Sequence, residues 1–144
     1  MRAPTVFLAM VLLAACQPSP PAYTGGGFDR LQTVDLVQGE GAEARAGDTV
    51  SVHYSGWLYD ESAEGQRGQR FDTSLERGQP FAFRLGAGRV IRGWDEGVVG
   101  MREGGTRVLM VPAEYGYGAQ GAGNRIPPGA SLVFEVELLE VTSD

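Results

Sequence analysis

The only histidine of the chain stands between two serines, where a hydrolase could keep a nucleophile and its base. Ser51, His53 and Ser55 follow each other at every second residue. Residues two apart on a strand share a face, but they do not approach as closely as a nucleophile and a general base must. The pattern therefore favours an ordinary strand histidine over nucleophilic catalysis.

A glycine-rich stretch offers a second chemistry, the binding of a dinucleotide. Residues Gly116 to Gly121 have the spacing GxGxxG. That motif works only between a strand and a helix, with an acidic residue about 20 positions later. Gly123-Asn124 and Pro127-Pro128 follow instead, so no helix can begin there. A turn is the better interpretation.

The remaining polar chemistry is sparse. The adjacent carboxylates Asp60-Glu61 and Asp95-Glu96 are expected to be solvated charges. One cysteine and one histidine are too few for a structural zinc site, so we expect no metal and no cofactor. All 12 basic residues are arginines, which removes Schiff-base lysines, and the net charge of −6 argues against nucleic acid as a partner.

The first residues predict export and a lipid anchor. Thr5 to Ala15 is an apolar run. It is shorter than the roughly 20 residues that span a bilayer, and with Arg2 before it the run fits a secretory signal. The ending Leu13-Ala14-Ala15-Cys16 resembles the lipobox of bacterial lipoproteins, which implies that Cys16 carries the lipid. The alternative is a plain secretory signal with an incidental cysteine.

The expected organisation has three parts, a signal peptide at 1–15, a lipidated Cys16 with a Pro- and Gly-rich linker at 16–27, and one domain at 28–144. The linker reaches at most ~40 Å, so the domain stays near the membrane. Residue 17 is Gln, not the Asp that resemblance to enterobacterial lipoproteins links to inner-membrane retention. We therefore expect the outer membrane, facing the periplasm.

The elements of the domain are mostly strands. Thr49–Tyr59 alternates, with Val50, Val52 and Tyr54 on one face, and Leu132–Leu138 alternates in the same way. Arg107–Val111 is a shorter strand. Apolar residues at three- and four-residue intervals predict one amphipathic helix, although its glycines require tertiary packing to hold it (Ile91, Trp94, Val98, Met101).

We therefore expect an α+β domain in which an antiparallel sheet covers one short helix. The polar, glycine-broken segment 59–70 is expected to be a long exposed hairpin loop or bulge. The domain also has more aromatic residues than strand packing explains, which suggests an apolar ligand pocket with a few polar groups (Tyr54, Phe71, Phe81, Phe83, Trp94, Tyr117, Phe134).

Seven short motifs carry a family resemblance when taken in order. They are Val52-His53-Tyr54-Ser55-Gly56, Phe71-Asp72-Thr73-Ser74, Pro80-Phe81-Ala82-Phe83, Val90-Ile91-Arg92-Gly93-Trp94-Asp95-Glu96-Gly97, Tyr115-Gly116-Tyr117-Gly118, Ile126-Pro127-Pro128 and the run 132–139. Together they resemble the FKBP-type peptidyl-prolyl cis-trans isomerases, over nearly everything from about residue 47 to 141.

The resemblance implies a twisted antiparallel sheet wrapped around one short helix, and one pocket for proline-containing polypeptides and rapamycin-type macrolides. It implies that Trp94 lies under the substrate proline ring, that the Ile91 N–H and the Tyr117 hydroxyl hold substrate carbonyls, and that Tyr54 and Arg77 hold Asp72. Asp72, Trp94 and Tyr117 are thus the expected catalytic residues. The expected substrate-binding residues are Tyr54, Phe71, Phe81, Val90, Ile91, Ile126 and Phe134.

The sequence departs from the family pattern in the loop before the two prolines, which has Ala122 and Arg125-Ile126, at Arg89, and in the longer segment 59–70. Arg125 and Arg89 are expected at the pocket rim. Arg125 could shift the preference for the residue before proline toward acidic side chains. Two other functions stay open, a holdase that binds proline segments without turnover and an adaptor that binds a partner through 59–70. Nothing N-terminal resembles a dimerisation arm, so a monomer is expected.

Overall fold

A computed structural model describes residues 22–143. Its strands are β1 (Gln32–Val37), β2 (Thr49–Tyr59), β3 (Arg67–Thr73), β4 (Phe81–Arg84), β5 (Thr106–Val111) and β6 (Leu132–Thr142); its helices are α1 (Arg92–Gly97) and the 3-10 turns η1 (Glu64–Gln66), η2 (Ala113–Tyr115) and η3 (Gly118–Gln120). The α+β class is confirmed.

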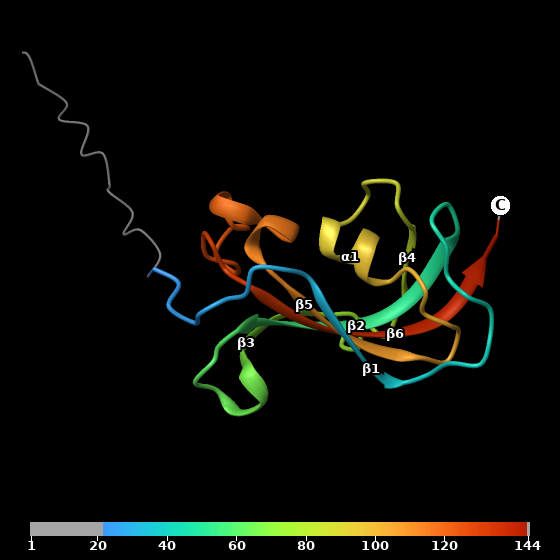
Figure 1. Cartoon of the computed structure of the whole chain (residues 1–144), viewed down its shortest axis with the longest axis horizontal. Helices are drawn as coiled ribbons and strands as arrows, with labels where there is room; N and C mark the ends of the chain where they lie inside the picture. The colour runs from blue at the N-terminus through green and yellow to red at the C-terminus, as the bar shows by residue number, and fades with distance from the viewer. Residues whose placement is uncertain (1–21, 144) are drawn as a thin grey trace, which may run out of the picture.

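All pairings in the sheet are antiparallel. The strand order is β1-β5-β6-β2-β3, and β4 pairs with β2 beside this path. The two long central strands pair along most of their length, from Thr49 opposite Thr142 to Leu58 opposite Leu132. The sheet curves around α1, which lies over one face (Figure 1). The expected sheet wrapped around one short helix is therefore confirmed.

Strand β2 has the predicted bounds and the predicted alternation. Val50 and Val52 are fully buried and Tyr54 is 9% exposed, whereas Ser51 and His53 between them are half-buried. In β6 the alternation holds from Phe134 to Leu138, but Val133 is also buried, and the strand continues to Thr142. The inward faces of β2 and β6 thus form the wall against which α1 packs.

Helix α1 is shorter than the apolar spacing predicted. It ends at Gly97, and the chain turns away at Gly100, which takes a left-handed conformation at φ +88°. Met101 lies beyond the helix but is still buried. The glycines inside the helix let it lie close to β5, since a Cβ on Gly93 would be 2.7 Å from Val111.

The segment 59–70 is only partly a loop. Its last residues, Arg67 to Arg70, belong to β3, which pairs with β2 in an irregular register. Arg67 explains the difference, because its guanidinium stacks 4.3 Å from the Trp57 ring centre and is 2.9 Å from Glu135. These contacts order a polar stretch that has no apolar pattern.

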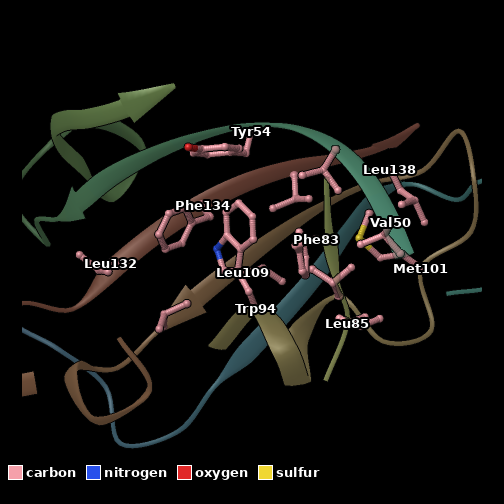
Figure 2. Packing of buried hydrophobic residues seen from close by; sticks show 14 of the residues in the cluster. Val50, Tyr54, Phe83, Leu85, Trp94, Met101, Leu109, Leu132, Phe134 and Leu138 are labelled. Carbon is pink, nitrogen blue, oxygen red and sulfur yellow. The ribbon is translucent and has the colours of Figure 1, made fainter. Parts of the chain in front are cut away.

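The buried core lies between the sheet and α1. Trp94 is at its centre, with Tyr54, Phe83 and Phe134 around it (Figure 2). Burial of these rings removes a large apolar area from water. This burial stabilises a six-residue helix that would not be stable alone. The aromatic surplus is thus partly core.

The expected signal peptide at 1–15 and the expected lipidated Cys16 lie outside the described residues. The end of the expected linker is held on the domain, because the Tyr23 hydroxyl donates a 2.6 Å hydrogen bond to the Tyr59 carbonyl. Burial of this phenol raises the pKa of Tyr23 to about 12. Among the helices of residues 22–143, none has the length and apolar content needed to cross a membrane.

Candidate active site

A pocket of about 200 Å³ opens where the sheet meets the first turn of α1. It is lined by side chains from five elements and the loops beside them: Tyr54, Phe71, Asp72, Phe81, Arg89, Val90, Ile91, Trp94, Tyr117 and Phe134. Every expected catalytic residue is present, and every expected substrate-binding residue except Ile126. The fold therefore gathers groups that are up to 80 residues apart in the sequence.

Trp94 forms the base of this pocket. Its ring meets the Tyr54 and Phe134 rings nearly edge-on, with centroids 4.8 and 5.4 Å away. The indole N–H has no hydrogen-bond acceptor within the described part of the chain, and the nitrogen lies on the side of the ring that faces Phe134 (Figure 2). With 4% exposure, the indole is held in one orientation and presents a flat apolar surface.

Phe71 and Phe134 form one wall, and a glycine makes room for them. Their rings are 5.5 Å apart at an angle of 90°. A Cβ on Gly56 would lie 2.7 Å from both rings. The close approach of backbone and rings at this position therefore depends on a residue without a side chain.

Asp72 is held by two donors that also bond to each other. The Tyr54 hydroxyl donates to Asp72 Oδ2 at 2.6 Å, and Arg77 Nη1 donates to Asp72 Oδ1 at 2.8 Å. Arg77 Nη2 completes the triangle by donating to the Tyr54 oxygen at 2.8 Å. Burial alone would raise the pKa of Asp72, but these bonds outweigh it and leave that pKa below its ordinary value. Asp72 is thus an oriented anion at the pocket wall.

Among the residues that line the pocket, Ile91 and Tyr117 each have a hydrogen-bond donor without an internal acceptor. The Ile91 backbone N–H, just before α1, and the Tyr117 hydroxyl make no hydrogen bond to any residue in 22–143. Burial, and then the charge of Asp72, raise the pKa of Tyr117 above its ordinary value, so its hydroxyl is a hydrogen-bond donor at neutral pH. Both groups are available to bind carbonyl oxygens.

Asp95 has a structural role that the sequence prediction missed. Its carboxylate accepts the backbone N–H groups of Gly86 and Gly88 at 2.9 and 3.0 Å. These two bonds stabilise the turn that leads to Val90 and Ile91. Asp95 is thus not simply a solvated charge. An acidic residue in a first helical turn, following Gly-Ala-Gly, was the available signal.

His53 does have a serine partner, but not one of its strand neighbours. Its Nδ1 is 2.9 Å from the oxygen of Ser74, which also accepts the Tyr54 N–H at 2.8 Å. His53 lies on the opposite face of β2 from Tyr54. It is a hydrogen-bonded strand histidine outside the pocket, as the spacing indicated. Within residues 22–143 no three or more His, Cys, Asp or Glu side chains cluster as metal ligands would.

Ile126 is the expected substrate-binding residue that the pocket does not include. It is 4% exposed, packs in the core, and exchanges backbone hydrogen bonds with Ala122. These bonds close the loop that follows η3. The glycine-rich stretch before it forms turns and η3, so the predicted turn is confirmed.

Comparisons with known proteins assign the chain to a family. The profile of the FKBP-type peptidyl-prolyl cis-trans isomerases matches residues 40–139. The chain belongs to this family. An FK506-binding protein of Neisseria meningitidis serogroup A is 55% identical over 107 residues, 74% of this chain and 92% of that protein.

Two further relatives extend the comparison. The human peptidyl-prolyl cis-trans isomerase FKBP2 is 42% identical over 138 residues, 94% of this chain and 92% of its own. The crystal structure of AtFKBP13 superposes with a TM-score of 0.66 at 38% identity, over 76% of this chain and 91% of that one. The FKBP fold is thus shared in three dimensions as well.

Proposed function

We propose that this protein accelerates rotation about Xaa-Pro bonds of exported polypeptides, with the proline ring on Trp94. The observation that carries the proposal is the combination of a fixed indole base with two unoccupied donors, the Ile91 N–H and the Tyr117 hydroxyl. An apolar pocket with a few fixed polar groups is the usual form of a small-ligand site.

The chemistry requires no bond to break. Rotation about a peptide bond faces a barrier of ~18–20 kcal/mol because amide resonance is lost, and at Xaa-Pro it takes tens to hundreds of seconds unaided. A twisted amide separates less charge than a planar one, so an apolar wall favours it. The two donors orient substrate carbonyls, which restricts the substrate to productive geometry.

Asp72 supports this geometry from the wall of the pocket. As an anion held by Tyr54 and Arg77, it fixes the orientation of the Tyr54 ring, which packs on Trp94. After burial, its charge is the second cause that raises the pKa of Tyr117, whose hydroxyl is the donor. No step of this mechanism needs a nucleophile, a metal ion or a proton transfer.

The proposed location is a bacterial membrane, with the lipid on Cys16 and the domain in the periplasm at the outer membrane. The lipobox-like Leu13-Ala14-Ala15-Cys16 supports this. The clients are then exported proteins with slow prolines, and the protein acts as a monomer. Because several relatives are named FK506-binding proteins, we propose that FK506 and rapamycin occupy the same pocket.

The enzymatic part is tested by a protease-free cis-to-trans assay on an Xaa-Pro peptide series, using the full chain in mild detergent. Wild type is compared with Trp94→Ala and Asp72→Ala, and with Val34→Ala on exposed β1 as the matched control. We expect wild type and Val34→Ala to show fast turnover that rapamycin inhibits. The two pocket variants should lose this turnover. Rapamycin binding without acceleration of any peptide would instead indicate a proline-binding holdase.

The location is tested separately, by Cys16→Ser in a Gram-negative host. Loss of fatty-acid labelling and release from the outer-membrane fraction are expected for this variant. Unchanged labelling, or an inner-membrane location of the wild type, would contradict the proposed anchor.

A further inference from the structure

A second cavity adjoins the proline pocket. This groove has a volume of about 420 Å³ and lies between β3 with the turn after it and the loop that follows η3. Phe71 and Asp72 line both cavities, so they form the ridge between them. A peptide that leaves the pocket across this ridge enters the groove.

The groove contains three guanidinium groups, and they differ in how they are occupied. Arg77 is bonded to Asp72 and Tyr54, and Arg70 is paired with Glu76. Arg125 has no carboxylate within ion-pair distance among residues 22–143. Its one hydrogen bond runs from Nη1 to the Phe71 carbonyl at 3.1 Å. Four of its five N–H donors are therefore free, on a side chain already held at the ridge.

The side chains that line the groove carry a net positive charge, whereas the whole protein is negatively charged. The chain carries a net charge of −6. At the groove, three arginines face the two carboxylates of Asp72 and Glu76, both of which are already paired. An anion approaching this point meets an unpaired guanidinium, which can bind a carboxylate through two parallel N–H donors.

The direction of the substrate follows from the proposed function, on which this inference rests. With the proline ring on Trp94, the carbonyl of the rotating amide belongs to the residue before proline. In the proposed function the Tyr117 hydroxyl binds a substrate carbonyl, and Asp72, a residue of the ridge, is the charge that acts on this hydroxyl. An amide carbonyl at Tyr117 places the preceding residue at the ridge of Phe71 and Asp72.

We propose that Arg125 makes this isomerase selective for an acidic residue immediately before proline, whose carboxylate it binds in the groove. Arg125 is a specificity residue in this scheme and takes no part in the rotation itself. The hydrogen bond to the Phe71 carbonyl pre-orients the guanidinium, which lowers the cost of ordering it on binding.

The test compares peptides that are identical except for Glu, Gln, Leu or Arg before proline. For the full chain in detergent, kcat/KM is measured for wild type, Arg125→Gln, Arg125→Lys and Arg89→Gln. Arg45→Gln is the matched control, because Arg45 is exposed and lines neither cavity. Peptides with Glu or Gln after proline check the direction of the substrate.

We expect wild type to favour Glu-Pro over Gln-Pro by about two- to fivefold, the size of an exposed ion pair. Arg125→Gln should bring this ratio to about one while Leu-Pro turnover and the unfolding midpoint stay near wild type, and Arg125→Lys should restore part of the ratio. The preference should also shrink between about 0.01 M and about 1 M salt, as the Debye length falls from about 30 to about 3 Å.

Three results would overturn the proposal. The first is a wild-type ratio of kcat/KM for Glu-Pro over Gln-Pro of one or less. The second is a ratio that Arg125→Gln leaves unchanged, or that only Arg89→Gln lowers to one. The third is a preference for Glu after proline in place of Glu before it. Failure of the proposed function looks different, because then neither Leu-Pro nor Gln-Pro is accelerated at all.

Discussion

The Tyr54 hydroxyl donates a 2.6 Å hydrogen bond to Asp72 Oδ2, from the centre of β2 to β3. The same Tyr54 ring is 9% exposed and packs edge-on against Trp94. The ring of Tyr54 therefore belongs to the core, whereas its hydroxyl belongs to the charged wall of the pocket. Changes to the Asp72 triangle should be felt both in stability and in turnover.

Tyr54→Phe tests this relationship with the smallest possible change. The ring and its packing stay, but Asp72 loses one donor and Arg77 loses an acceptor. We expect the pKa of Asp72 to rise, the free energy of unfolding to fall by about 1 kcal/mol, and turnover to decrease. NMR titration of the Asp72 carboxyl and urea unfolding measure the first two. An unchanged Asp72 pKa would show that Arg77 alone holds the carboxylate.

The pH dependence of stability has a definite sign at Asp72. Its pKa in the folded protein lies below the ordinary value of 3.8. The anion therefore contributes stability at any pH above the pKa of the unfolded chain, and this contribution disappears as pH falls through the folded pKa. When the pH is lowered from neutral to below 3.8, the free energy of unfolding should therefore fall less for Asp72→Asn than for wild type.

Urea unfolding of both proteins at the two pH values gives the comparison, with Glu140→Gln on an exposed residue of β6 as control. The control should follow the wild-type curve. Equal acid sensitivity of wild type and Asp72→Asn would mean that the triangle adds no pH-dependent stability.

Gly56→Ala should damage the pocket by a single methyl group. The added Cβ would meet the Phe71 and Phe134 rings at 2.7 Å, and both rings line the pocket. Overpacking of this kind costs about 1–3 kcal/mol, and ring displacement should weaken rapamycin binding. Calorimetric unfolding and a binding titration measure the two effects. Adding Phe71→Leu should recover part of the stability loss, and no recovery would place the strain elsewhere.

The central strands could be predicted because their apolar residues alternate against one core. Val50, Val52 and Tyr54 show this in β2, where predicted and observed bounds agree. Strand β1 has no such signal, since all six of its residues are exposed. It is placed by its pairing with β5 and by the 2.6 Å ion pair between Arg107 and Asp35, 72 residues apart. Contacts at that distance leave no local pattern.

The pocket residues followed from the family motifs, and the structure brings nearly all of them together. Ile126 shows the limit of that reasoning, because a motif gives adjacency in sequence but not the direction of a side chain. His53 shows another limit, since its partner Ser74 comes from the turn after β3. Both depend on how loops fold back on the sheet, which spacing along one strand does not determine.

Asp95 gives the last prediction, because it connects helix α1 to the turn that carries the Ile91 donor. Its two oxygens accept the N–H groups of Gly86 and Gly88. Asp95→Ala removes both bonds, which at about 0.5–1.5 kcal/mol each should lower the free energy of unfolding by about 1–3 kcal/mol. Because Ile91 would be less well positioned, kcat/KM should fall further than the small population of unfolded protein explains.

Glu96→Ala is the matched control for Asp95→Ala. Glu96 is the next residue of α1, and its contact with Arg92 is an exposed ion pair within one helical turn, which contributes little. The control should stay near wild type in both unfolding and turnover. If Asp95→Ala lost stability but kept full kcat/KM, the turn would support the fold without positioning the Ile91 N–H, and the positioning role of Asp95 would have to be abandoned.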